Sequence, residues 1–394
     1  MESIDLRYQP SVIELSQKAL QNNISYLKKG VGKGVRLSSV IKGNAYGHGI
    51  STFLPMAERC GIDHFSVFSA DEAWRAMQAR TSDASDVMIM GMIADEAIEW
   101  AVEQGVSFYL FEMGRLESAV AAAIKTGMRA RVHIQLETGM NRIGFEEEEL
   151  DQLLASLERN HEWIAVEGVC THFAGAESIA NHVRIEEQKR KFSRMVFRFR
   201  SGLFDPFLLH AASSAATFAY PDTRYDMVRI GIAQYGYWPS REVYMLMRKN
   251  DYDFTENPLE RVIRWRSKVM SVKEVGEGEF VGYGTIYLTN RPETIATVPV
   301  GYTHGFGRNL TNIGHVLVRG ERVRVVGQVN MNMLTIDVTD VPQVQRGDEV
   351  VLIGKQGEQE ISVASFGELT NNLNYEVLTR LPSELPRLVF GGDS

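Results

Sequence analysis

The 394-residue sequence is poor in cysteine, with only Cys60 and Cys170. Both lie in apolar surroundings, and nothing around them has the spacing of metal ligands. Two isolated thiols argue against a disulfide framework and against a cysteine metal site. We expect buried free thiols in a reducing compartment and no bound metal.

Long hydrophobic runs and an excess of basic residues are also missing. Nowhere do about 18 apolar residues follow one another, as a transmembrane helix would require. The first ten residues, MESIDLRYQP, carry two acids and lack the basic start and apolar core of a signal peptide. Lys and Arg number 42 against 50 Asp and Glu, for a net charge of -8. We therefore expect a cytoplasmic protein that binds a small molecule and neither nucleic acid nor membrane.

Eight short apolar runs alternate with amphipathic, helix-length stretches between residues 35 and 231. The runs are VRLSSVI from 35, HFSVFS from 64, DVMIMG from 86, VSFYLF from 106, RVHIQLE from 131, IAVEGVCT from 164, PFLLHAA from 206 and YDMVRIG from 225. A (β/α)8 barrel needs eight such units in roughly 200 to 250 residues, whereas a doubly wound open sheet usually has about five or six strands. The sequence therefore predicts an α/β fold with an N-terminal, TIM-like (β/α)8 barrel.

The composition changes after the eighth run. Residues 241–260, REVYMLMRKNDYDFTENPLE, are polar, irregular and typical of a linker. Beyond them the sequence offers mainly strand-like runs, namely RVIRWRSKVMSVKEV, TIATVPVGY, HVLVRGERVRVVGQV, NMLTIDV and DEVVLIG, before one helical stretch, SVASFGELTNNL. We predict a barrel domain over residues 1–245 and a mostly β domain over 246–394.

Several polar residues follow the predicted barrel strands, where the loops of such barrels build active sites. Lys42 follows the first strand within VIKGNAYGHG, Arg142 the fifth and His172 the sixth. A lone lysine at a strand end is usually a solvated surface charge. A lysine whose surroundings lower its pKa can instead form a Schiff base with an aldehyde cofactor.

Small residues follow the last two barrel strands, in HAASSAA and MVRIGIAQYG, and this is a common phosphate site in barrels. Arg229 falls within the final strand. A charged side chain there needs a partner or water, because an unpaired buried charge is costly. A structural ion pair would explain Arg229 as well as a ligand would.

Eight segments, taken in order, resemble the signature blocks of the alanine racemase family and together span nearly the whole chain. They are VIKGNAYGHG, HIQLETGMNRIGF, GVCTHFAGAE, HAASSAATFAYPDTRYDMVRIGIAQYG, VGYGTIY, VPVGYTHGF, VGQVNMNM and LNYEV. The resemblance implies a barrel followed by a mostly β domain, pyridoxal 5'-phosphate as cofactor, and a head-to-tail homodimer whose active sites take groups from both chains. It also implies the supply of D-alanine for the cell wall, although the physiological direction stays open.

By this resemblance Lys42 holds the cofactor and acts as the base on one face of the substrate Cα. Tyr283 of the partner chain is the base on the opposite face. The cofactor serves as an electron sink, and one base on each face inverts the centre. Arg229 would donate a hydrogen bond to the pyridine nitrogen. Because a guanidinium stays protonated and cannot accept a hydrogen bond, the nitrogen must accept and therefore remains unprotonated. His172 would lie near Arg229 and tune Tyr283, and His210 would extend the same hydrogen-bond chain.

The remaining assignments also come from the resemblance. The positions that match the family's phosphate site are Tyr46, Ser214, Gly231, Ile232 and Tyr375. Arg142 and the backbone of Met331 match the carboxylate site of the substrate. Tyr302 and Tyr375 would narrow the entrance, which favours small amino acids.

The chain departs from the family pattern near the predicted pocket. Gln135 stands where many members carry a lysine that becomes carbamylated, and a glutamine cannot be carbamylated. The other departures are Ser213 for asparagine, Asn330 and Asn332 in a block that commonly reads Cys or Ser, Met, Asp, and Thr303 and His304 for alanine and aspartate. Asn332 and His304 both remove an acid, so serine or a broader range of amino acids is an alternative to alanine.

Two other readings compete with a racemase. A decarboxylase or aldolase of the same cofactor fold would share Lys42 and the phosphate site, but such decarboxylases usually use a cysteine of the second domain. Both cysteines of this chain fall in the predicted barrel. A non-enzymatic pyridoxal-phosphate carrier would resemble the barrel alone, and would bind cofactor without exchanging a Cα proton.

Overall fold

The computed structural model describes residues 10–200, 206–250, 256–370 and 373–391, and its internal contacts divide the chain into two compact units. The barrel unit comprises Lys18–Ala45 and Phe53–Glu260. The sheet unit comprises Met1–Gln17, Tyr46–Thr52 and Arg261–Ser394. Among the described residues, no helix is long and apolar enough to cross a membrane.

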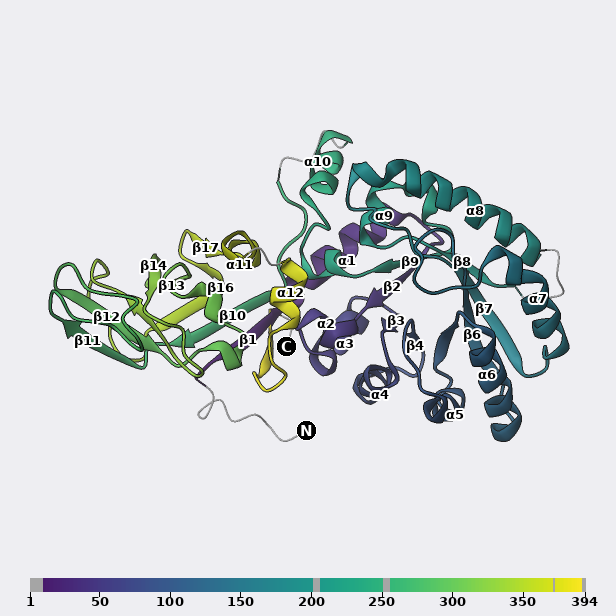
Figure 1. Ribbon diagram of the computed structural model, residues 1–394, viewed down its shortest axis with the longest axis horizontal. Coiled ribbons are helices and arrows are strands. Elements are labelled where there is room, and N and C mark those ends of the chain that lie inside the picture. The colour runs from purple at the N-terminus through teal and green to yellow at the C-terminus, as the bar shows by residue number, and fades with distance from the viewer. Residues whose placement is uncertain (1–9, 201–205, 251–255, 371–372, 392–394) are drawn as a thin grey trace. The chain divides into compact units, whose positions relative to one another are not determined.

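Eight parallel strands form the core of the barrel unit, in the order β8-β7-β6-β5-β4-β3-β2-β9 (Figure 1). They are β2 (Arg36–Val40), β3 (His64–Val67), β4 (Asp86–Ile89), β5 (Ser107–Leu110), β6 (Ala130–Gln135), β7 (Ile164–Cys170), β8 (Leu208–His210) and β9 (Met227–Ile230). A bridge between Ser213 and Arg229 brings the end of β8 beside β9, so the ring is nearly closed. The predicted barrel and all eight of its strands are confirmed.

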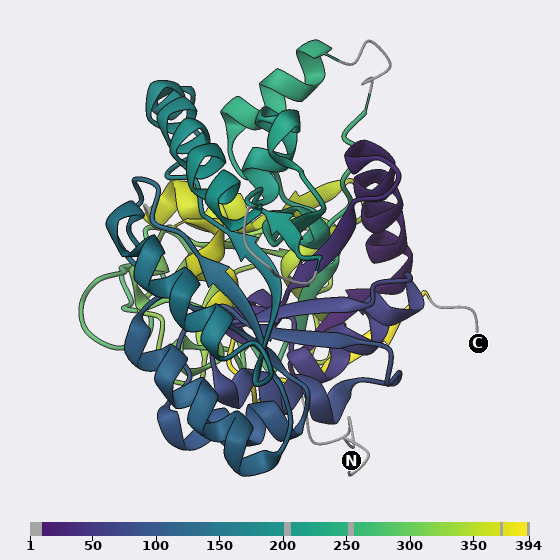
Figure 2. The same cartoon turned by 90° about the vertical axis from the view of Figure 1, so that its right-hand side faces the viewer.

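Helices surround these strands (Figure 2). They are α1 (Gln17–Val31), α3 (Ile50–Arg59), α4 (Ala70–Ala79), α5 (Asp95–Glu103), α6 (Met113–Thr126), α7 (Leu150–Arg159), α8 (His182–Arg200), α9 (Ser214–Ala219) and α10 (Arg241–Asn250). Their apolar residues recur every three to four positions, as Leu150, Leu153 and Leu157 of α7 do, and these three are buried. Gly127 ends α6 in the left-handed conformation, with φ 69°.

The prediction of a linker from residue 241 was wrong for its first half, because α10 occupies Arg241–Asn250. The hydroxyl of Ser240 accepts a hydrogen bond from the amide of Val243 at 3.1 Å, as a helix cap does. Val243 is buried, whereas Met245 and Leu246 are exposed. The least exposed residues of this helix are Val243, Tyr244 and Met247, which recur at helical spacing within a stretch that is otherwise polar.

The sheet unit is built on strands in the order β11-β12-β15-β14-β13-β16-β10-β1-β18, with β17 paired to β16. They are β1 (Val12–Ser16), β10 (Ile263–Lys268), β11 (Ser271–Val275), β12 (Glu293–Val298), β13 (His315–Val318), β14 (Glu321–Val326), β15 (Leu334–Asp337), β16 (Glu349–Gln356), β17 (Gln359–Ile361) and β18 (Arg387–Phe390). Two helices, α11 (Val363–Thr370) and α12 (Asn374–Thr379), follow β17. The predicted mostly β C-terminal region is confirmed.

The N-terminal strand β1 was not predicted, and it belongs to the sheet unit. It pairs antiparallel with β10 and parallel with β18. The sheet unit is therefore assembled from both ends of the described chain. A five-residue strand whose partners lie some hundreds of residues away leaves no local pattern that reveals this pairing.

Candidate functional site

Lys42 opens an unusual turn directly after β2. The turn is α2 (Lys42–Tyr46), in which Gly43, Asn44, Ala45 and Tyr46 have φ of 62°, 52°, 53° and 50°. A left-handed backbone costs roughly 1–2 kcal/mol for each residue that carries a Cβ, so three successive non-glycine residues here store strain. Such strain persists only where neighbouring groups hold it, and it is concentrated at functional sites.

Glu72 of α4 holds this turn. One carboxylate oxygen, Oε1, accepts hydrogen bonds from the amides of Gly43 at 2.6 Å and Asn44 at 3.3 Å. The other, Oε2, accepts from the amide of Phe68 at 2.9 Å. Glu72 could not be recognised from the sequence, because an acidic residue in the first turn of a helix is common and needs no functional explanation.

The amine of Lys42 has a lowered pKa. Part of the side chain is exposed, but the protein around the amine removes enough water to penalise its charged form. Arg142 and Arg229 lower the pKa further, and Glu72 opposes them. Because a lower pKa enlarges the neutral fraction of the amine, Lys42 is better suited to act as a nucleophile and a base.

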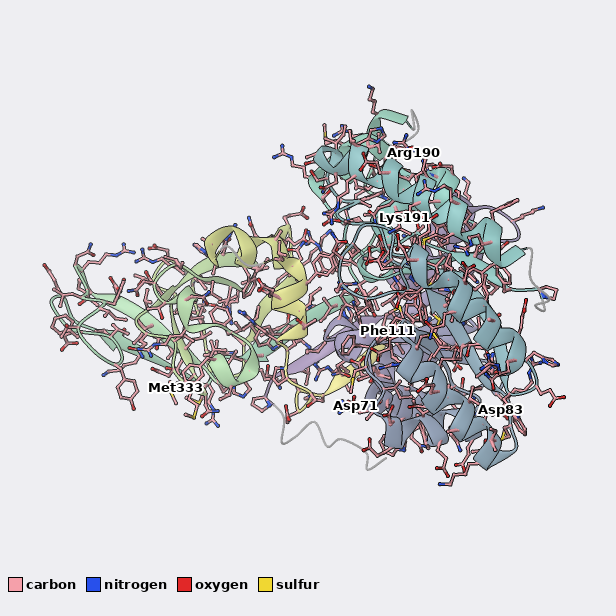
Figure 3. All side chains as sticks on the ribbon, turned by 45° about the vertical axis from the view of Figure 1, so that its right-hand side comes forward. Asp71, Asp83, Phe111, Arg190, Lys191 and Met333 are labelled. Atoms are coloured by element: carbon pink, nitrogen blue, oxygen red, sulfur yellow. The ribbon has the colours of Figure 1, made fainter. Side chains whose placement is uncertain are left out.

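We expect the Glu72→Gln variant to lower the pKa of Lys42 further, because the substitution removes the one negative charge that raises it. The measurement is the pH dependence of acylation of Lys42 in cofactor-free protein, followed by mass spectrometry. Asp71→Asn, at an exposed neighbouring carboxylate labelled in Figure 3, is the matched control. An unchanged or raised pKa in Glu72→Gln would contradict this electrostatic role.

Arg229 lies almost buried in β9, with 5% of its surface exposed. Its NH1 donates to Nδ1 and the carbonyl of His210 at 2.5 and 3.0 Å. Its NH2 donates to the carbonyls of Thr171 and Ala211 at 2.8 and 3.1 Å. In the described part of the chain no acceptor takes the remaining Nε–H, which is therefore available to a ligand.

His172 follows β7 and belongs to the same basic group. Burial, together with Arg229, Arg142 and Lys42, lowers its pKa to about 3, so the imidazole is neutral at physiological pH. The structure thus gathers Lys42, Arg142 and Arg229 around a neutral histidine. This concentration of positive charge suits an anionic ligand.

Ser214 and Gly231 meet where β8 and β9 end. The amide of Gly231 donates to the hydroxyl of Ser214 at 2.9 Å. Helix α9 begins at Ser214, and the short helix η5 (Ile232–Tyr235) begins at Ile232. First turns leave N–H groups without an acceptor in their own helix, and such groups favour phosphate.

The backbone of Arg142 is held by Glu137, which the sequence analysis also missed. Glu137 accepts hydrogen bonds from the amides of Gly139 at 2.5 Å and Arg142 at 3.3 Å. Burial alone would raise the pKa of Glu137, but hydrogen bonds from this backbone hold it below its usual value. Asn141, at φ 56°, lets the loop turn back on the carboxylate.

Gln135, where the family pattern usually has lysine, contacts a thiol instead. Its side-chain oxygen accepts from Sγ of Cys170 at 3.3 Å. Burial raises the pKa of Cys170 to about 11, so this thiol is protonated and unreactive at neutral pH. Both cysteines are buried and free, as predicted.

The other predicted site residues belong to the sheet unit. The rings of Tyr46 and Tyr375 lie 5.9 Å apart between centroids. Tyr283 is 71% exposed, between Gly282 and Gly284 at φ 76° and 70°. Tyr302 and Met331 are also exposed.

The departures near Met331 form one hydrogen-bonded set. Thr303 donates to the carbonyl of Met331 from its amide at 3.1 Å and from its hydroxyl at 2.7 Å. The side-chain amide of Asn332 donates to the hydroxyl of Thr303 at 3.1 Å. His304 accepts from the amide of Gly301 at 3.1 Å. Thr303 and Asn332 are therefore hydrogen-bonded to each other, and both side chains are uncharged.

Comparison with known proteins decides the family. The model of the alanine racemase N-terminal domain matches residues 15–239, and that of the C-terminal domain matches residues 262–389. The chain belongs to the alanine racemase family. It is accordingly an amino acid racemase.

Individual relatives agree with this family. The alanine racemase of Leptospira interrogans is 33% identical over 385 residues, which cover 96% of this chain and 95% of the relative. The crystal structure of alanine racemase from Bacillus anthracis with bound L-Ala-P is 31% identical, with a TM-score of 0.88 over 98% of this chain and 96% of that one. The alanine racemase of Bartonella henselae with covalently bound pyridoxal phosphate is 26% identical, with a TM-score of 0.82 over 97% and 99%.

No group of three or more metal-ligating side chains occurs among the described residues. The groups that the site does offer are the basic side chains around Lys42 and the backbone amides at the ends of β8 and β9.

Proposed function

We propose that this chain interconverts L- and D-alanine with pyridoxal 5'-phosphate as cofactor. Lys42 exchanges the Cα proton on one face of the substrate, and Tyr283 of a second copy of the chain exchanges it on the other. The observation that carries this proposal is the left-handed turn, held by Glu72, that presents Lys42 at the end of β2, where Arg142 and Arg229 help to lower the pKa of its amine. Racemisation of an amino acid needs a base that removes the Cα proton and, close to it, cationic groups that bind the anionic groups of substrate and cofactor.

The residues of the barrel unit fit the cofactor. Lys42 would hold it covalently, and the amides near Ser214, Gly231 and Ile232 would hold its phosphate. The free Nε–H of Arg229 suits a ring nitrogen that accepts a hydrogen bond. When bound, the cofactor delocalises the electron pair that remains at Cα after the proton has left. The family resemblance alone assigns Tyr46 and Tyr375 of the sheet unit to the phosphate as well.

The role of Tyr283 requires a second copy of the chain. Its exposed phenol is accompanied in the sheet unit by other exposed apolar side chains, which are Phe280, Ile286, Leu288, Met331 and Met333; Met333 is labelled in Figure 3. Exposed apolar residues that gather along neighbouring loops commonly mark an interface. A symmetric homodimer would cover them and bring Tyr283 to the partner's site.

Alanine is the proposed substrate because the alanine racemases of Leptospira interrogans and Bacillus anthracis match nearly the whole chain. Arg142 and the amide of Met331 would bind its carboxylate, and Tyr302 would limit its side chain. Serine is the second candidate, since Asn332 and Thr303 place uncharged hydrogen-bonding groups beside Met331. We also propose that the enzyme works in the cytoplasm and supplies D-alanine for the cell wall.

The test is a substrate panel. Cofactor-loaded protein is incubated separately with L-alanine, L-serine, L-lysine and L-glutamate, and each D-enantiomer is measured by chiral chromatography. We expect the highest kcat/KM with alanine. Because one methylene or hydroxyl changes recognition by only about 1–3 kcal/mol, serine should react more slowly but measurably. A preference for lysine or glutamate would refute the proposed substrate.

A further inference from the structure

A buried chain of side chains leads from Arg229 through the inside of the barrel unit. NH1 of Arg229 lies 2.5 Å from Nδ1 of His210. Nε2 of His210 lies 3.0 Å from Nδ1 of His133. Nε2 of His133 lies 3.9 Å from Oε2 of Glu167. Both imidazoles are buried, and neither His133 nor Glu167 is among the residues assigned above to cofactor or substrate.

The donors and acceptors of this chain can run in only one direction. A guanidinium only donates, so Nδ1 of His210 must accept from Arg229. In a neutral imidazole the other nitrogen then carries the proton, so Nε2–H of His210 donates to Nδ1 of His133. By the same reasoning His133 carries its proton on Nε2, which has no hydrogen-bond partner among the described residues and faces Oε2 of Glu167 as a nearby acceptor, at 3.9 Å.

The surroundings keep both imidazoles neutral, as this direction requires. Burial first, and then Arg229, place the pKa of His210 well below its usual range. Burial first, and then His64 and Arg131, do the same for His133. Two neutral rings have one donor and one acceptor nitrogen each, so the tautomer of one fixes that of the other.

A bulge in β7 places the carboxylate at the end of this chain. Val132 pairs with Val166, whereas the next residue, His133, pairs with Gly168. Glu167 is thus an extra residue in β7, and bulges of this kind re-aim side chains. Its Oε1 accepts from Nε of Arg131 at 2.5 Å, and its Oε2 lies toward Nε2 of His133.

Gly168 makes room for the two imidazoles. A Cβ at this position would lie 2.1 Å from Nδ1 of His133 and 3.0 Å from Nε2 of His210. The φ of Gly168 is not positive, so the glycine is not needed for the backbone conformation. Glycine is needed because a side chain at this position would overlap the two hydrogen-bonded nitrogens of His133 and His210.

We propose that His133 and Glu167 are positioning residues for Arg229. His133 supplies the acceptor for Nε2–H of His210, so the tautomer that Arg229 requires has a partner at both of its nitrogens, and the His210 ring held in this way orients Arg229 with its Nε–H free for a ligand. The inference rests on the proposed function only in taking that ligand to be the cofactor ring. The hydrogen-bond chain itself is a property of the protein without cofactor.

The first test reads the tautomers directly. Protein labelled with ¹⁵N at the histidine rings is examined by NMR without cofactor, because protonated and unprotonated ring nitrogens have well-separated shifts. We expect His133 and His210 each to carry the proton on Nε2 in the unmodified protein. A proton on Nδ1 of His210 in the unmodified protein would overturn the proposal, whatever the enzyme's activity.

Variants of His133 separate positioning from packing. His133→Leu fills the space but offers no acceptor, whereas the side-chain oxygen of His133→Asn can stand in for Nδ1. We expect the leucine variant to lose the single His210 tautomer, shift the absorption of bound cofactor, and lower kcat by about 10- to 100-fold with little change in KM, as loss of outer-shell partners does at metal sites. The asparagine variant should largely restore the single His210 tautomer, the absorption of bound cofactor and kcat. Unaltered His210 signals and kcat in His133→Leu would refute the proposal.

A double-mutant cycle tests the role of Gly168 without relying on activity. Gly168→Ala should lower Tm strongly in the unmodified protein and much less in a His133→Ala background, because the second change removes the ring that the new methyl group would meet. Equal losses of Tm in both backgrounds would contradict a glycine retained for the imidazole pair. If racemisation is absent but the tautomers and this coupling are found, the proposed function fails while the hydrogen-bond chain stands.

Discussion

Replacing Lys42 by methionine is expected to abolish racemisation, with kcat reduced by at least about a thousandfold. The loss of a positioned general base alone typically costs about 10² to 10⁴ in rate, and the loss of the covalent attachment adds to it. Methionine keeps the length of the side chain but removes the amine. The measurement combines the initial rate of D-alanine formation with intact mass after borohydride reduction, which should show cofactor attached to the unmodified protein and not to Lys42→Met.

Folding should survive this substitution, because Lys42 contributes a positive charge to a neighbourhood that already holds Arg142 and Arg229. We expect Tm to be unchanged or slightly raised. Lys33→Met is the matched control, since Lys33 is exposed in the turn before β2. Borohydride-fixed cofactor that persists in Lys42→Met would place the attachment elsewhere and contradict the account of the site.

Replacing Tyr283 by phenylalanine is expected to stop racemisation while leaving half of the chemistry intact. The phenol is the proposed base on one face only, so kcat should fall by about 10² to 10⁴. Lys42 still serves the other face. In D2O, one enantiomer of alanine should therefore continue to exchange its Cα proton, and its mirror image should not.

Tyr287→Phe provides the control from the same loop. The hydroxyl of Tyr287 donates to Glu293 at 2.9 Å, within the sheet unit. Its loss should lower Tm modestly and leave both exchange reactions in place. If Tyr283→Phe exchanged both enantiomers at equal and undiminished rates, Tyr283 would not be a base, and a single group would have to serve both faces.

The barrel could be predicted because each of its strands carries its own evidence. Runs such as VRLSSVI and VSFYLF are buried on both faces, as parallel strands require. The helices between them can be recognised in the sequence as well, because their apolar residues recur every three to four positions. The pairing of β1 with β10 and β18 could not be predicted, because it depends on residues far apart in the sequence. The helix at 241–250 could have been predicted, because Val243, Tyr244 and Met247 recur at helical spacing, but the polar residues around them were taken for a linker.

The site shows the same division. Lys42 and Arg229 could be found because a lysine after a strand and an arginine inside one are conspicuous against apolar surroundings. The roles of Glu72, Glu137 and His133 could not be predicted, because they depend on hydrogen bonds to atoms that only the folded structure brings close. Glu72 becomes significant only once its oxygens are seen to accept from the left-handed turn after Lys42.

The most direct test of two-base racemisation follows the isotope at Cα during the first few per cent of conversion of L-alanine in D2O. We expect newly formed D-alanine to carry solvent deuterium while the remaining L-alanine keeps its original hydrogen, because one base removes the proton and another, equilibrated with solvent, returns a deuteron. D-alanine that retains the original hydrogen would show a single base acting on both faces. Bound cofactor with neither exchange nor conversion would contradict the enzyme itself.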